Sequence, residues 1–116
     1  MLKINRSVKF SALDMELTAK TLNALEGNTL SMAISDALTM EDESEKVLQF
    51  YRVAVDTLSQ ILDNLPIQDG DSVVDWKSLS HDDRTELLYM LQVSEVIEIF
   101  TKYREAIVPS EGDKKK

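Results

Sequence analysis

Three aspartates, Asp69, Asp71 and Asp75, have the residue type and the close spacing that could bind a metal ion. They resemble part of a calcium-binding loop, in which several oxygen ligands surround the cation and a correctly placed glycine bends the chain. In this sequence Gly70 falls between the first two aspartates, and no glutamate stands where such a loop would close. An acidic turn close to the start of a helix is therefore the favoured interpretation.

The single histidine, His81, is followed by Asp82, Asp83 and Glu86, a second group that could hold a metal. Zinc sites combine several histidines and cysteines, whereas this sequence has one histidine and no cysteine. The same composition leaves hydroxyl side chains without an obvious base and supplies no thiol nucleophile. The three glycines form no phosphate-binding loop. The sequence thus predicts neither an enzyme nor a cofactor or metal site, and it favours a solvated helix start at His81.

Length and composition predict one globular domain in the cytoplasm. The chain has 116 residues, of which 43% are hydrophobic and 29% charged, as in ordinary soluble domains. Its apolar runs are shorter than the roughly 20 residues that a membrane-spanning helix needs. The first ten residues are partly basic but are not followed by the apolar core of a secretion signal. We therefore expect no membrane partner.

The net charge of −8 is concentrated in one part of the chain. Residues 41–86 contain twelve acidic and four basic side chains, and the acids and bases on either side of this segment balance. Such an acidic belt disfavours approach to nucleic-acid phosphates, because it supplies no excess of cationic groups to neutralise them. The sequence predicts no nucleic-acid partner, and a solvated face that keeps the protein soluble is the favoured interpretation of the belt.

The fold class predicted by hydrophobic periodicity is mainly α: a compact four-helix domain over residues 1–109, with a flexible polar tail at 110–116. The first ten residues alternate apolar and polar side chains, which predicts a short N-terminal strand or, equally, an extended arm. The other strand candidate is the segment 72–76. A first helix is predicted from Ser11, with Asp14 placed as in a capping box, to a stop at Gly27.

The second predicted helix, residues 29–40, is apolar on most of its sides. Helices of this kind are normally buried, either in their own core or under a partner. Its two methionines suit a surface that accepts another helix, because their side chains are adaptable. We therefore predict a partner-binding site on this helix, made of Leu30, Met32, Ile34, Ala37 and Met40.

The third and fourth predicted helices are amphipathic. The third follows the acids at 41–45 and ends at Pro66, with apolar residues recurring at intervals of four and three (Val47, Tyr51, Ala54, Leu58, Ile61 and Leu65). The fourth is predicted as one helix from a cap at Ser80 to Val108, before Pro109. In the loop between them, Trp76 is expected to hold the loop onto the core. The alternative for Trp76 is a hot spot at a partner surface.

The stretch "SHDDRTELLYMLQVSEVIEIFTKYREAIVPSEGDKKK" resembles the tail assembly chaperones of long-tailed bacteriophages. The resemblance covers the whole chain in size, acidity and predicted helical content, and it is most specific from Trp76 to Lys116. It implies a protein that binds the long helical tape measure protein, and keeps it soluble while the tail tube protein polymerises around it. Many members of the family are also made in a longer form by a programmed ribosomal frameshift.

The final "KKK" bears on that longer form. Lysine codons are AAA or AAG, so three of them require a run of adenines, which readily contains a slippery sequence. Together with the resemblance, this favours a frameshift signal in the last codons, with the segment 110–116 as a linker; otherwise it is a frayed, solubilising end.

Two other classes of function share the same general features. An acidic inhibitor that mimics nucleic acid would present carboxylates at phosphate-like spacing over an extended face, whereas here bases are interspersed among the acids of 41–86. A helical homo-oligomeric adaptor would use the apolar segment 29–40 to bind another copy of itself. Binding by mimicry should weaken steeply with salt, whereas apolar docking should persist.

Overall fold

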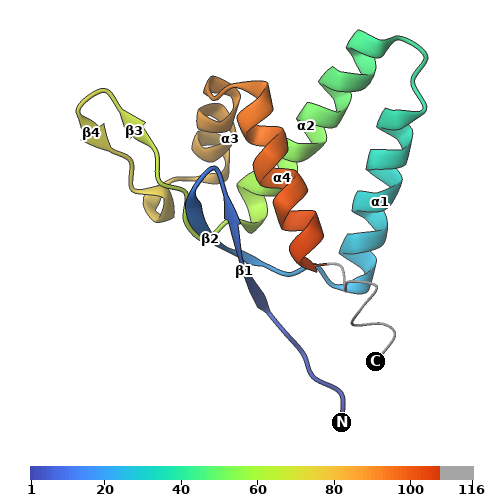
Figure 1. Cartoon of the computed structure of the whole chain (residues 1–116), viewed down its shortest axis with the longest axis horizontal. Helices are drawn as coiled ribbons and strands as arrows, with labels where there is room; N and C mark the ends of the chain where they lie inside the picture. The colour runs from blue at the N-terminus through green and yellow to red at the C-terminus, as the bar shows by residue number, and fades with distance from the viewer. Residues whose placement is uncertain (108–116) are drawn as a thin grey trace.

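The computed structural model describes residues 1–107, in which four α-helices and an N-terminal β-hairpin form one mostly helical domain (Figure 1). This confirms the predicted fold class. The hairpin packs against the last helix, which also contacts the second helix. The elements in chain order are β1 (Ser7–Ala12), β2 (Met15–Lys20), α1 (Ala24–Leu38), α2 (Glu43–Ile61), β3 (Gln68–Asp69), β4 (Ser72–Val73), the 3₁₀ turn η1 (Trp76–Ser78), α3 (His81–Met90) and α4 (Val93–Ile107).

The prediction of a helix from Ser11 to Gly27 is wrong. Residues 7–20 form an antiparallel hairpin whose two-residue turn is Leu13–Asp14. Both turn residues have positive φ, 52° and 61°, as the hairpin turns that match strand twist require. The alternation of the first ten residues continues through the turn, because Phe10, Ala12, Leu17 and Ala19 are all buried on one face.

The N-terminal segment combines the strand and the arm that the sequence left open. The strand begins at Ser7, and residues 1–6 extend away from the body (Figure 1). The segment 72–76 does not pair with this strand: β4 pairs with β3 in a separate small hairpin, and Gly70 in its turn has a φ of 62°. The other edge of β2 is held by the chain after α2, since Thr18 N–H donates to Asn64 Oδ1 at 2.8 Å.

Helix α1 begins at Ala24, before the cap predicted at Thr29 or Ser31, so Gly27 lies inside the helix rather than at the end of another. Its start is a capping box: Glu26 N–H donates to Asn23 Oδ1 at 2.8 Å, and Asn23 N–H donates to Glu26 Oε1 at 3.0 Å. The predicted capping role of Ser11 was thus assigned to the wrong segment. Helix α1 and α2 form an antiparallel pair joined by a short loop (Figure 1).

Helix α2 confirms the predicted amphipathic pattern, and its apolar stripe forms the centre of the core. Asp42 caps it by accepting from the backbone of Ser44 at 2.8 Å, and the helix ends at Ile61, four residues before the last residue of the predicted stripe. Ala54 and Leu58 are fully buried beside side chains from α4 and the hairpin. The strands and α4 therefore cover the face of α2 that the sequence identified.

The predicted fourth helix is two helices. Ser80 caps α3 as predicted, accepting from Asp83 N–H at 3.2 Å, but the helix stops at Met90 and α4 begins at Val93. The break at 91–92 contains neither glycine nor proline. Gln92 starts the new helix, since its N–H donates to Glu95 Oε1 at 3.0 Å and its carbonyl accepts from Val96. The corner lets α4 turn back across α2 (Figure 1).

The predicted role of Trp76 as a loop anchor is confirmed. Its indole is buried, and Nε1 donates to the carbonyl of Leu62 at 3.0 Å. The guanidinium of Arg84 lies 5.0 Å from the ring centroid, and its Nε donates to the Trp76 carbonyl at 3.1 Å. One side chain thus joins the end of α2 to the start of α3.

Among residues 1–107, none of the helices combines the length and the apolar composition needed to cross a bilayer. The predicted stop at Pro109, the polar tail at 110–116 and its lysines lie outside the described residues.

Candidate functional site

The candidate site is α1, the helix on which the sequence predicted partner binding. Ile34 and Ala37 are its buried side chains, and most of the others are exposed. Helix α1 leans away from α3 and α4 and contacts the body mainly through α2 (Figure 1). A helix attached along so narrow a face leaves much of its surface open to another molecule.

The five residues predicted to bind a partner do not share one exposed face. Met32 is exposed, with 61% of its surface accessible, whereas Ile34 and Ala37 are buried in the structure. Leu30 and Met40 are half-buried. Within the isolated chain, therefore, Met32 is the fully available member of the set, Leu30 and Met40 are available at their edges, and the other two hold α1 to the body.

The prediction missed Leu25, which is 76% exposed on α1. Leu25 and Met32 are seven residues apart, so they lie on the same side of the helix, about two turns from each other. The side chains between and beside them on this face are Asn28, Ser35 and Thr39, which are uncharged, and the exposed carboxylate of Asp36, four residues after Met32. We call this the α1 face. The spacing of its two apolar residues was visible in the sequence, but the wrong start assigned to the helix excluded Leu25.

Two open grooves flank α1. One, about 610 Å³ in volume, lies between α1 and α2, and its apolar lining includes Leu22, Leu25, Leu30 and Val53. The other, about 600 Å³, lies between α1, β1 and the end of α4, and Ile34 and Ile107 contribute to it. Leu22 and Leu30 line both grooves. An apolar helix could therefore lie along α1 and place side chains on either side of it.

The charges around the grooves are few. Lys20, Glu26 and Asp56 line the first groove, and Arg104 lines the second, where its guanidinium lies 5.8 Å from the centroid of Phe100. Charges at the margin of an apolar surface orient a partner more than they increase its affinity. The site is therefore a docking surface in which apolar side chains alternate with polar ones and charges are few.

Tyr103 ties together the elements at the base of α1. Its side chain is buried, and its hydroxyl donates to the carbonyl of Lys20 at 2.7 Å. Burial, and to a lesser degree the nearby carboxylate of Glu26, raises the pKa of Tyr103 from 10.0 to about 12. Its ring also contacts Phe10 edge to face at 5.8 Å. One ionisable side chain on α4 thus contacts β1 and the end of β2, close to the start of α1.

Replacing Tyr103 by phenylalanine should make stability less sensitive to alkaline pH. In the wild type the folded state holds the tyrosine proton more tightly than the unfolded state does, so stability is unaffected below pH 10 and falls as the pH rises towards about 12. Tyr103→Phe should cost about 1 kcal/mol at neutral pH through the lost hydrogen bond. Urea unfolding followed by circular dichroism at neutral and alkaline pH would measure both effects.

The comparison must allow for Tyr51, whose pKa is also raised, by burial and then by the nearby Tyr89. The Tyr103→Phe variant should therefore still lose some stability at alkaline pH, because Tyr51 remains. Equal loss of stability with pH in the variant and the wild type would contradict the assignment to Tyr103.

The polar groups considered first in the sequence lie elsewhere. Asp69 and Asp71 belong to the β3–β4 hairpin, and within the described part of the chain no cluster of three or more acidic or histidine side chains could hold a metal. His81 Nδ1 lies 3.3 Å from Ser59 Oγ, a pairing that the sequence did not reveal. The serine is buried and its hydroxyl also contacts the carbonyl of Asp56 at 2.8 Å, so the side-chain pair fastens α3 to α2.

No family model, curated protein sequence or solved structure matches this chain.

Proposed function

We propose that this protein is a tail assembly chaperone of a long-tailed bacteriophage. It binds helical segments of the tape measure protein in the host cytoplasm, and keeps them soluble until the tail tube protein assembles around them. The observation that carries the proposal is the α1 face, where Leu25 and Met32 are exposed on a helix with two carboxylates, Glu26 and Asp36, between two partly apolar grooves. The sequence resemblance described above supplies the class of client.

The geometry suits recognition of one helix by another. An amphipathic client helix lays its apolar side into a groove, with anchor residues three or four apart. The exposed side chains of Leu25 and Met32 would meet such a stripe, and Leu22 and Leu30 would form the floor on either side. Methionine can adjust its shape to different neighbours, which suits a chaperone that holds many similar helices.

The expected affinity is moderate. Full burial of one large aliphatic side chain contributes about 1.5–3 kcal/mol, and Leu25 and Met32 are already partly covered by their own helix. The loss of motional freedom on association opposes this gain by several kcal/mol, so only part of it remains as binding free energy. A reversible complex is what a chaperone requires, because the tube protein must later take its place.

The double substitution Leu25→Lys and Met32→Lys should abolish co-purification of the tape measure protein. Each lysine would place a charge under the client's apolar stripe, where binding removes water from the surface, and burying that charge is costly. Because both positions are solvent-exposed, the melting temperature should stay close to that of the wild type. The measurement is co-expression with the tail proteins encoded in the same genome, followed by affinity purification through this chain.

Val73→Lys is the matched control, because Val73 is 80% exposed on the β3–β4 hairpin, away from α1. It should leave co-purification unchanged. Retention of the client by the double variant would contradict the assignment of the site to the α1 face, and absence of any tail protein from the wild-type preparation would contradict the proposed function.

The two other classes of function give different results in the same preparation. A homo-oligomeric adaptor would show a multimer by light scattering without any client, and the double variant would dissociate it. A nucleic-acid mimic would bind a basic partner, and this binding would weaken steeply between low and high salt. The α1 face has one carboxylate, Asp36, and no regular row of them, so salt should have little effect on client binding there.

A further inference from the structure

A second exposed apolar surface lies at the corner between α3 and α4, beside the start of α2. We call it the corner surface. Its side chains are between 43% and 78% exposed, although all are large and apolar or aromatic. They are Val47, Leu48, Tyr89, Met90 and Val93.

These residues come from three helices, and the packing of α3 on α2 brings them to one end of the molecule. The two helices run antiparallel: Ser59 Oγ lies 3.3 Å from His81 Nδ1 at the start of α3, and the rings of Tyr51 and Tyr89 meet at 5.5 Å near its end. The Tyr51 hydroxyl also donates to the carbonyl of Leu88 at 3.3 Å. Continuing the alignment by one turn places the α3–α4 corner level with the first turns of α2.

The corner surface continues two stripes that are buried elsewhere. Val47 precedes the buried Tyr51 by four residues on the core face of α2, and Val93 precedes the buried Val96 by three on the core face of α4. Residues at these spacings lie on the same side of a helix. The apolar stripes of α2 and α4 therefore both become exposed at the same end of the molecule. An apolar partner bound there would extend the buried core by about one helical turn.

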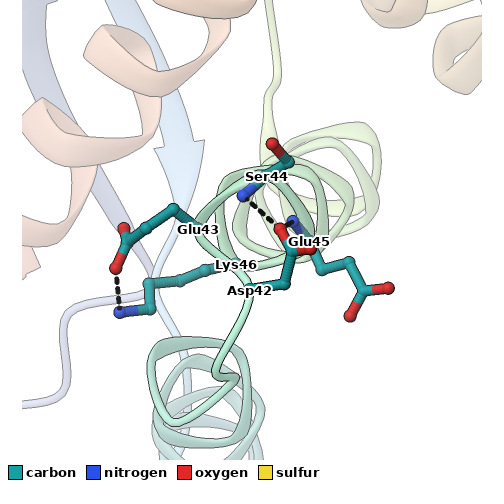
Figure 2. A network of polar contacts seen from close by, with 5 residues as sticks. All are labelled: Asp42, Glu43, Ser44, Glu45 and Lys46. Atoms are coloured by element: carbon teal, nitrogen blue, oxygen red, sulfur yellow. Dashed lines mark hydrogen bonds and ion pairs between the residues drawn. The ribbon is translucent and has the colours of Figure 1, made fainter.

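The surroundings of the corner surface are acidic. The loop and first turn of α2 carry most of these groups (Figure 2). Lys46 pairs with Glu43 at 3.1 Å, so it is already partly neutralised. Along the chain, the acids within four residues of members of the corner surface are Glu43, Glu45, Glu86 and Glu95, preceded by Glu41 and Asp42, and the bases are Lys46 and Arg52. The surface therefore combines an apolar centre with a margin of net negative charge.

We propose that the corner surface binds a partner helix whose apolar stripe is flanked by lysine and arginine. The apolar stripe would cover the ends of the two core stripes, and the basic flanks would meet the acidic margin. A second copy of this chain fits less well, because a two-fold contact would bring two acidic margins together. The inference does not rest on the function proposed above, since it concerns a different face and a different charge.

Two synthetic peptides of about 18 residues, each long enough for five helical turns, test the charge of the partner. One has a leucine stripe flanked by lysines, and the other has glutamate at every lysine position. Binding is measured by fluorescence anisotropy of the labelled peptides titrated with the full chain. The lysine peptide should bind, and the glutamate peptide should bind at least about tenfold more weakly. Added salt should weaken binding of the lysine peptide. Equal binding of the two peptides would overturn the proposal.

Single substitutions locate the contact. Met90→Lys should weaken binding of the lysine peptide about tenfold or more, because it places a buried like charge in the interface. Val47→Lys, on a different helix, should weaken binding in the same way. It provides a second test of the surface if Met90→Lys is unstable. Val73→Lys adds the same charge to the β3–β4 hairpin and should have little effect. Similar weakening by Val73→Lys would show that the peptide responds to net charge rather than to this surface.

The acidic margin has its own matched pair. The double variant Glu41→Gln with Glu45→Gln leaves the cap residue Asp42 in place. It should weaken binding of the lysine peptide several-fold and make that binding less dependent on salt. Asp69→Asn with Asp71→Asn removes the same charge from the β3–β4 hairpin and should change binding less. A chain that is dimeric without peptide and becomes monomeric on Met90→Lys would instead identify the corner surface as a contact between copies.

Discussion

Replacing Phe100 by alanine is expected to lower the free energy of unfolding by about 3–5 kcal/mol, and Leu58→Ala by about 2–5 kcal/mol. Both side chains are fully buried. Phe100 meets the ring of Phe50 edge to face at 5.7 Å, which joins α4 to α2 at the centre of the domain. Each truncation removes apolar contacts and leaves a cavity that the rigid helix pair can only partly close. Urea unfolding followed by far-UV circular dichroism would measure both changes.

The exposed neighbours Thr101 and Gln60 supply the controls on the same two helices. Thr101→Ala and Gln60→Ala should change stability by about 0.5 kcal/mol or less, because they remove few contacts and alanine favours helix. If Phe100→Ala and Leu58→Ala were as mild as these controls, the packed faces of α2 and α4 would be wrongly assigned.

Trp76→Ala should cost about 3–5 kcal/mol, an effect as large as that of a core position although Trp76 lies in a connection between helices. The variant loses a buried ring, and the hydrogen bond from Nε1 to Leu62 at 3.0 Å. It also removes the ring over which Arg84 lies. Because Trp76 is the single tryptophan, unfolding must be followed by circular dichroism rather than by tryptophan fluorescence.

Trp76→Phe separates the apolar contribution from the polar one. Phenylalanine keeps most of the buried surface but cannot donate to the Leu62 carbonyl, so we expect a smaller loss of about 1–3 kcal/mol. Arg84→Gln, which leaves the indole in place, should cost less than Trp76→Ala. Equal losses for Trp76→Phe and Trp76→Ala would contradict the view that apolar burial dominates at this position.

The two candidate surfaces differ in charge, and this difference predicts different partners. The α1 face has few charged neighbours, Glu26 and Asp36, whereas more carboxylates lie close along the chain to the corner surface. Raising the salt concentration should therefore leave binding at the α1 face nearly unchanged and weaken binding at the corner surface.

Much of the fold could be predicted because helical periodicity is local. The spacing of apolar residues from Val47 to Ile61 identified the core face of α2, and Ser80 identified the start of α3. Burial of Trp76 was also expected from its place before a helix cap. These features depend on neighbours a few residues away, so they can be recognised in the sequence alone.

The β-hairpin was missed because its turn lacks the usual signal. Two-residue hairpin turns favour asparagine and glycine, which adopt positive φ readily. Here Leu13 and Asp14 adopt it, and the N–H of Leu13 donates to Glu98 Oε2 at 3.1 Å, a contact from α4 that lies far away in the sequence. The break between α3 and α4 likewise has no glycine or proline to announce it, and it allows α4 to pack on both α2 and the hairpin.

The sequence by itself determined that this is an acidic, mainly helical chain with an amphipathic α2 and an apolar segment around α1. Only the tertiary structure decided which apolar residues of that segment are available. Ile34 and Ala37 face the body and are buried, whereas Leu25 and Met32 face outwards. The physical reason is that a helix with apolar residues on most sides can pack by any of them. The side that becomes its core face is set by the neighbours that the rest of the fold brings to it.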